Sequence, residues 1–233
     1  MLNTMWSPKG GVGLSVTAAA TAALYAKRDG TAVLVHLCGD QPALLGLRDP
    51  KGPGVFDWLA SEGASAESLN QLLVECPAGV ELLPMGDATT WHSERGNVLG
   101  RALGSLSRTV IIDAGVQGWT PNSETVDQQD TSSVSKLRSD LVSSLIDAGR
   151  SILVTSACYL ALRRAVRMNL AESGLIVVSD PGRALNGRDV SSVLGHPLLA
   201  QIERDPAVSR SVDAGMFLRR PNRSLESALK DLL

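Results

Sequence analysis

The sequence SPKGGVGLS at residues 7–15 decides the fold of this 233-residue chain. It follows a short apolar run at residues 2–6 and precedes an alanine-rich segment at residues 16–26, so we expect it to join a strand to a helix. Glycines let successive backbone N–H groups turn toward one anion, and the following helix adds its free N–H groups and the positive end of its dipole. The pattern predicts a phosphate-binding loop; the alternative is a glycine-rich turn without a ligand.

Three side chains set the chemistry of this loop. Ser15 places a hydroxyl at the start of the helix, where it can bind a magnesium ion held between phosphates. A standard phosphate loop has a lysine directly before this serine, and Leu14 stands there instead. Lys9 lies five residues earlier, before the paired glycines. The loop therefore keeps its backbone cradle and loses the lysine that balances charge on the outer phosphates.

The arrangement Lys-Gly-Gly-Val-Gly-x-Ser resembles the deviant phosphate loop of the ParA/MinD family of ATPases. The resemblance implies a single P-loop domain over residues 1–233, with a doubly wound, mostly parallel α/β sheet and helices on both faces. It implies ATP or ADP with Mg²⁺ as ligands, and a homodimer in which Lys9 reaches the partner's nucleotide as a catalytic residue. The expected nucleotide-binding residues are Lys9, Gly10, Gly11, Val12, Gly13, Leu14, Ser15 and Val16.

A second stretch, TVIIDAG at residues 109–115, supports this interpretation. Its β-branched residues predict a buried parallel strand, and its last part delivers the carboxylate of Asp113 to the ligand crevice of an α/β sheet. The resemblance implies that Asp113 holds magnesium together with Ser15. The alternative is that Asp113 caps a helix or a turn.

The strand predicted at residues 31–37 departs from the family pattern. ParA/MinD-like proteins end this strand in Asp-x-Asp, whose second carboxylate orients the attacking water, but here the two positions hold His36 and Cys38. Asp40 follows two residues later and is the candidate for a displaced catalytic acid; the alternative is a turn residue before Pro42. His36 reads as a core histidine, and Cys38 as a small buried residue.

The remainder of the chain alternates strands with helices, which indicates a parallel sheet. Helices are expected at residues 55–61, 66–74, 132–148, 159–171, 188–194 and 207–214, and strands at 80–84, 151–155, 174–179 and 198–202. We expect Trp91 in a surface stretch, and a mobile switch-like loop at residues 116–131. Ser179 replaces the asparagine with which the family reads adenine, so the resemblance leaves the base preference open.

Composition narrows the possible partners. A net charge of -2 argues against a wholly basic nucleic-acid-binding protein, although arginines cluster at residues 163–167 and 219–223 and the resemblance allows non-specific DNA binding. The final segment, residues 224–233, has a leucine stripe but carries Glu226 and Asp231 as well as Lys230. That mixture makes membrane binding an unlikely role and favours packing on the core or a partner. Three cysteines without metal-ligand spacing suggest reduced thiols in the cytoplasm.

The chain departs from the family pattern at Leu14, Cys38 and Ser179, and these departures leave three functional hypotheses open. The first is a nucleotide-binding dimerisation switch with weak or absent hydrolysis, serving chromosome partitioning, division-site placement or pilus placement together with a protein partner. The second is a nucleotide-free scaffold that recruits partners. The third is a slow ATPase that uses Lys9 across a dimer and Asp40 as the displaced acid.

Overall fold

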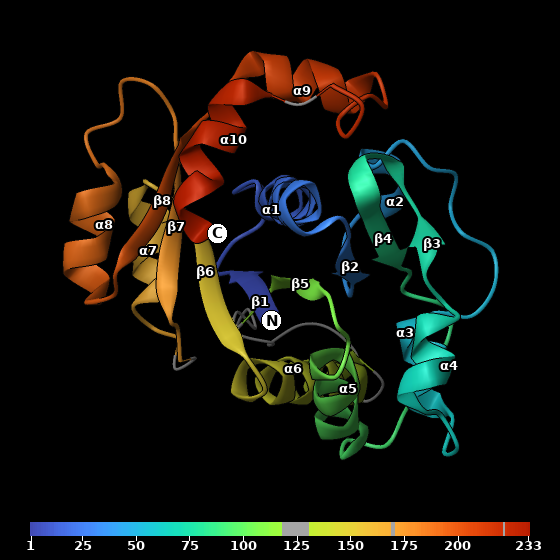
Figure 1. The fold of residues 1–233 in the computed structure, drawn as a ribbon. Coiled ribbons are helices and arrows are strands. Elements are labelled where there is room, and N and C mark those ends of the chain that lie inside the picture. The colour runs from blue at the N-terminus through green and yellow to red at the C-terminus, as the bar shows by residue number, and fades with distance from the viewer. Residues whose placement is uncertain (118–130, 169–170, 221) are drawn as a thin grey trace.

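The computed structural model describes residues 1–117, 131–168, 171–220 and 222–233. Within these residues the strands form one eight-stranded sheet in the order β3-β4-β2-β5-β1-β6-β7-β8 (Figure 1). The strands are β1 Leu2–Ser7, β2 Ala32–His36, β3 Val74–Glu75, β4 Val80–Leu83, β5 Thr109–Val116, β6 Arg150–Ser156, β7 Gly174–Ser179 and β8 Leu198–Glu203. Neighbouring strands are parallel except for β3, which pairs antiparallel with β4 at one edge.

Helices cover both faces of the sheet (Figure 1). One face carries α1 Leu14–Asp29, α2 Gln41–Leu44, α9 Pro206–Asp213 and α10 Arg223–Leu229, with the short 3₁₀ helices η1 Pro77–Gly79 and η2 Lys230–Leu232. The other carries α3 Val55–Ala60, α4 Ala66–Asn70, α5 Arg95–Gly104, α6 Thr131–Asp147, α7 Tyr159–Ala165 and α8 Gly187–Leu194. The prediction of a doubly wound, mostly parallel sheet is confirmed.

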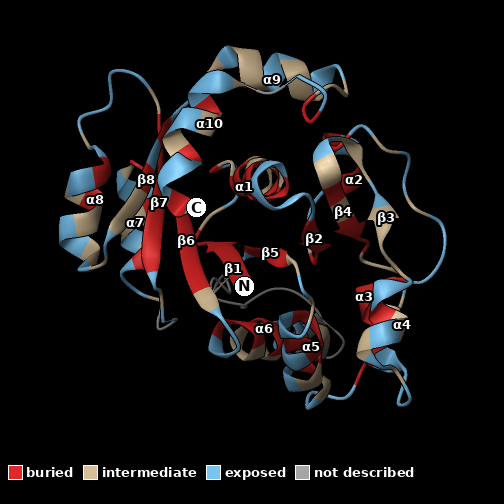
Figure 2. Ribbon diagram, in the orientation of Figure 1, coloured by how far each residue is buried: buried red, intermediate tan, exposed pale blue. Residues whose placement is uncertain are grey.

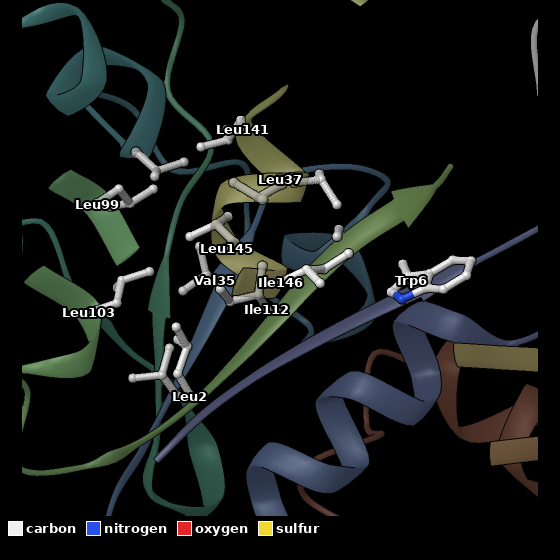
Figure 3. Packing of buried hydrophobic residues seen from close by; sticks show 14 of the residues in the cluster. Leu2, Trp6, Val35, Leu37, Leu99, Leu103, Ile112, Leu141, Leu145 and Ile146 are labelled. Carbon is white, nitrogen blue, oxygen red and sulfur yellow. The ribbon is translucent and has the colours of Figure 1, made fainter. Parts of the chain in front are cut away.

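The central strands are buried along nearly their whole length because helices cover both faces of the sheet, and most of their side chains are apolar (Figure 2). Successive side chains point to opposite faces, so Met5 and Ile111 join the core beneath α1. Trp6 and Ile112 join the core on the opposite face, beside residues from α5 and α6 (Figure 3). A strand with only one covered face would need polar residues at every second position.

Two local predictions were wrong. The helix expected at residues 66–74 ends at Asn70, and Val74 instead pairs with Leu82 as part of β3. Trp91, expected on the surface, is buried and stacks on Phe56 with ring centroids 4.8 Å apart. Val74 pairs with Leu82 and Trp91 stacks on Phe56, and neither contact is visible in the pattern of the segment that was misassigned.

Other boundaries also differ from expectation. The helix predicted at residues 159–171 ends at Ala165, and α5 was not predicted at all. Strand β5 extends to Val116 and helix α6 begins at Thr131. The expected switch-like loop between them lies, at residues 118–130, outside the described residues.

The C-terminal segment was expected to pack on the core or on a partner, and in the structure it packs on the core. Leu225, Leu229 and Leu232 are buried in the cluster beneath α1. The hydroxyl of Tyr25 donates a hydrogen bond of 2.7 Å to the carbonyl of Leu232, which fixes the last residues against α1. In the part of the chain that the structure describes, no helix combines the length and the apolar character needed to cross a membrane.

Candidate functional site

The candidate site lies at the carboxyl edge of the parallel strands, next to the end of β1. Strand β1 lies between β5 and β6. Strands β2 to β5 lie on one side of it and β6 to β8 on the other, so the order in which strands are added reverses at β1. Open α/β sheets bind ligands at such a switch point. The loop at residues 8–13 therefore occupies the position where the topology favours a ligand.

The glycines give the loop a shape that other residues adopt only with strain. Gly11 and Gly13 have φ values of +75° and +91°, in the left-handed region. Gly13 is the N-cap of α1, and as a glycine it has no side chain to cover the first N–H groups of the helix. The 16-residue helix α1 thus presents uncapped N–H donors and its positive dipole end to the loop.

Leu14 lies where a standard phosphate loop has its lysine, and its side chain is part of the core. It is buried in the cluster that also contains Met5 and Val178. The apolar side chain thus contributes packing energy and no charge. Any positive charge near bound phosphates must come from another residue.

Asp113 lies beneath the loop in the second half of β5, where it pairs with Met5 and His36 of the neighbouring strands, and it is fully buried. Its carboxylate accepts hydrogen bonds from Gln41 Nε2 at 2.8 Å, from the backbone N–H of Gly115 at 3.2 Å, and from the Ser15 hydroxyl. Burial raises the pKa of Asp113, and the hydrogen bonds from Ser15 and Gln41 offset part of this effect, so the pKa stays above its usual value. The structure brings together the two residues predicted to hold magnesium.

Gln41 is a site residue that the sequence analysis missed. Besides its bond to Asp113, its Nε2 atom donates to the backbone carbonyl of Ser15 at 3.1 Å, so its amide joins the two magnesium candidates. Its other amide atom, Oε1, is buried and has no hydrogen-bond partner among the described residues. Its position directly after Asp40 was the available signal, but an uncharged amide beside a carboxylate does not by itself indicate a site residue.

The oxygen atoms at this point suit a magnesium ion. A hydroxyl from Ser15, a carboxylate from Asp113 and the unpaired amide oxygen of Gln41 are hard donors of the kind that Mg²⁺ prefers. The residues present therefore fit a magnesium ion bound together with phosphate groups.

The end of β2 places the three remaining candidates in different surroundings. His36 is buried, and its Nε2 atom lies 2.8 Å from the carbonyl oxygen of Gly39. Cys38 is half-buried, and burial together with the nearby charge of Asp113 raises its pKa, so this thiol is not activated. Asp40 is exposed at the N-cap of α2, with no side-chain capping bond. A catalytic role for Asp40 stays a prediction.

Lys9 belongs to the loop and is only partly covered. Its Nζ atom donates to the carbonyl of Gly10 at 3.1 Å in an exposed position. Burial would raise the pKa of Cys158, yet the Ser156 hydroxyl, the backbone of α7 and the charge of Lys9 together lower it. The charge of Lys9 thus acts on the thiol at the N-cap of α7 as well as on its own loop.

An open cleft of about 570 Å³ extends from the loop between α1 and the ends of β7 and β8. Apolar side chains contribute much of its lining, among them Val16, Val178 and Val208. Ser179, at the family's adenine-reading position, is buried and donates to the carbonyl of Ile202 at 3.4 Å. Its hydroxyl is therefore directed to β8.

Arg204, directly after β8, is the second site residue that the sequence analysis missed. Its Nη2 atom donates to the carbonyl of Gly11 at 2.7 Å, and its Nε atom lies 2.9 Å from Asp180 Oδ1. The signal available was its position between Glu203 and Asp205 at a strand end. Nothing in a pair of neighbouring charges indicates a contact with a loop 193 residues away.

The two arginine clusters lie on opposite faces of the sheet. Arg163 and Arg167 are exposed on or next to α7, whereas Arg219, Arg220 and Arg223 are exposed at the start of α10. Because α7 and α10 pack on different faces, the clusters do not combine into one basic surface. Binding of DNA stays a prediction.

Comparison with known proteins points to the fold. No family model matches the sequence, and neither does any curated protein. Among solved structures, a ParA family ATPase from Chlorobium tepidum TLS superposes with a TM-score of 0.69 and 18% identity, over 99% of this chain and 96% of that one. MinD complexed with Mg-ADP from Pyrococcus horikoshii OT3 gives 0.70 and 20%, over 99% and 93%. MinD in the MinC:MinD complex of Aquifex aeolicus gives 0.68 and 18%, over 99% and 92%.

The chain has the ParA/MinD fold. In each comparison the likeness extends over nearly the whole length of both chains. At identities of 18% to 20%, the likeness shows a shared path of the backbone. It does not show that the side chains of the site have the same roles. In the ParA/MinD fold of this protein, the glycine loop, Ser15 and Asp113 lie together, while Leu14 and Cys38 contribute no charge there.

Proposed function

We propose that this protein binds ATP or ADP with Mg²⁺ and acts as a nucleotide-dependent dimerisation switch with weak or absent hydrolysis. The observation that carries the proposal is the open loop at the N-terminus of α1, with Ser15 hydrogen-bonded to the buried Asp113 beneath it. An unliganded turn has no need of a buried carboxylate whose pKa is raised by its surroundings.

Each part of the site has a separate task in this proposal. The N–H groups of residues 10–16 cradle the phosphates, and Ser15 and Asp113 hold magnesium, which balances phosphate charge when bound. Lys9 is partly exposed, and among the described residues its ammonium group bonds only to the carbonyl of Gly10 in its own loop, so it can turn toward a nucleotide held by a second copy of the chain. The cleft beside α1 offers an apolar surface for the base.

Hydrolysis suffers more than binding from the substitutions in this chain. Loss of one charge-assisted lysine contact removes about 1.5 to 3 kcal/mol, which weakens binding by roughly tenfold or more without abolishing it. Loss of the carboxylate at Cys38 removes the group that would orient the attacking water. We therefore expect turnover to be slow, with Asp40 as the candidate for a displaced catalytic acid.

The biological role proposed is subcellular positioning, for example in chromosome partitioning, division-site placement or pilus placement. This proposal is supported by the likeness to a ParA family ATPase and to the structure of a MinC:MinD cell division protein complex. A protein partner of a positioning system is the corresponding expectation for this chain.

Calorimetry with ATP and ADP, with and without Mg²⁺, tests the proposal on the purified chain. We expect binding that strengthens with Mg²⁺, and a loss of about tenfold or more in the Mg²⁺-dependent part for Ser15→Ala, because that hydroxyl is a proposed ligand. Absence of binding at millimolar nucleotide would overturn the switch.

The second candidate is the nucleotide-free scaffold, and the burial of Leu14 in the core favours it. It predicts no nucleotide binding but capture of a protein partner. The slow ATPase is distinguished by phosphate release that disappears in Asp40→Ala.

A further inference from the structure

Arg204 fixes a positive charge at the side of the phosphate loop. Its guanidinium group bridges two segments, donating from Nη2 to the carbonyl of Gly11 at 2.7 Å and pairing through Nε with Asp180 at 2.9 Å. Asp180 follows β7 and Arg204 follows β8, so both are anchored to neighbouring strands of the sheet. This geometry holds the guanidinium group beside the loop before any ligand arrives.

The same side chain faces the cleft. Arg204 lines it together with Gly13 and Val16 of the loop and α1, and its side chain is 43% exposed. A guanidinium group has five N–H donors in a planar fork and stays charged at all physiological pH values. Two contacts use two of these donors, so the group can bind a phosphate while it remains paired with Asp180.

The charge is needed at this loop. Leu14 removes the lysine of a standard phosphate loop, and its side chain is buried in the core. Lys9 is partly exposed and is expected to serve a partner's nucleotide. A bound polyphosphate would otherwise meet backbone N–H groups and magnesium without a cationic side chain from its own subunit.

We propose that Arg204 contacts the phosphate groups of the nucleotide and supplies, within the same subunit, the positive charge that Leu14 does not provide. This inference rests on the proposed function, since it names a recognition residue of that site. Asp180 orients the guanidinium group, and Arg183, whose Nη2 atom lies 3.4 Å from the same carboxylate, is not among the residues that line the cleft.

The test compares Arg204→Gln, Arg204→Lys and Arg183→Gln with the wild type. Arg183→Gln is the matched control because it removes the other arginine paired with Asp180. Calorimetry with ATP, ADP and adenosine separates phosphate recognition from base recognition. We expect Arg204→Gln to weaken ATP and ADP about tenfold or more and to leave adenosine unchanged, while Arg204→Lys recovers part of the loss and Arg183→Gln changes little.

The outcomes separate this inference from the function on which it rests. If the wild type binds neither ATP nor ADP, both are overturned. If it binds them and Arg204→Gln matches Arg183→Gln, only the role of Arg204 is overturned. An equal loss for adenosine and ATP would also overturn it, because a residue that merely shapes the cleft would weaken both ligands alike.

Discussion

At the scale of single residues, the site combines one buried carboxylate with several lost charges. Asp113 keeps an ionisable group in the core, where ionisation is costly, although Ser15, Gln41 and Gly115 donate hydrogen bonds to it. Leu14, by contrast, is an apolar side chain packed in the core, and Cys38 is a half-buried thiol without charge. A carboxylate that destabilises the folded chain is expected where a ligand compensates for it.

Asp113→Asn should therefore stabilise the protein without nucleotide. The pKa of Asp113 is raised in the folded state, so the folded chain loses stability as pH rises from the unfolded pKa, about 3.9, through the folded value. Gln41 can turn its unpaired Oε1 toward the new amide nitrogen, at the cost of the bond from its Nε2 to the Ser15 carbonyl.

Urea unfolding between pH 4 and pH 7 measures this effect. We expect the free energy of unfolding of Asp113→Asn to exceed that of the wild type increasingly toward pH 7, while its stabilisation by Mg²⁺ and nucleotide is reduced. A constant difference across this pH range would show that Asp113 does not titrate as proposed.

At the scale of secondary structure elements, α1 is held between the sheet and the C-terminal segment. Its small residues Ala18, Ala19 and Ala22 are buried completely, which lets the helix approach the strands closely. Helix α10 covers its other side, with Leu229 buried and Tyr25 bonded to Leu232. The position of the phosphate loop at the start of α1 thus depends on the last residues of the chain.

Leu229→Ala should destabilise the fold by about 2 to 5 kcal/mol, because it removes a fully buried side chain and leaves a cavity. Leu233→Ala is the control, since Leu233 is 43% exposed and a surface change is expected to stay within about 0.5 kcal/mol. Chemical denaturation of both variants measures the difference. Equal values would mean that the C-terminal segment does not support α1.

At the scale of the whole molecule, the carboxyl edge of the sheet gathers residues from all parts of the sequence. Lys9 follows β1, Asp113 lies in the second half of β5 and Arg204 follows β8, and each reaches the same loop or the residues beneath it. The proposed switch requires this edge to meet a second copy of the chain, because Lys9 acts across the interface.

Sedimentation of the protein with ATP and Mg²⁺ should show a mass twice that seen without nucleotide. Lys9→Ala is expected to reduce this dimer at least tenfold, since a charge-assisted contact with the partner's phosphate is lost. Lys27→Ala, at the far end of α1 and paired with Glu226, should leave dimerisation unchanged. If both variants behave alike, Lys9 does not reach across the interface.

The sequence by itself determined the architecture and part of the site. Apolar strands alternating with amphipathic segments require a parallel sheet covered on both faces, and the glycine spacing of residues 7–15 requires a turn before a helix. Asp113 was predictable because a strand end fixes where its last side chain goes. These properties depend on periodicity and local backbone geometry, which a sequence displays directly.

Only the tertiary structure decided the rest. Gln41 reaches Asp113 across 72 residues and Arg204 reaches Gly11 across 193, while Trp91 is buried because Phe56 lies against it. Such contacts depend on strand order and on where neighbouring strands end, and no local pattern encodes them. The physical reason is that a hydrogen bond or a stacked pair belongs to two segments at once, whereas propensity and periodicity describe one segment at a time.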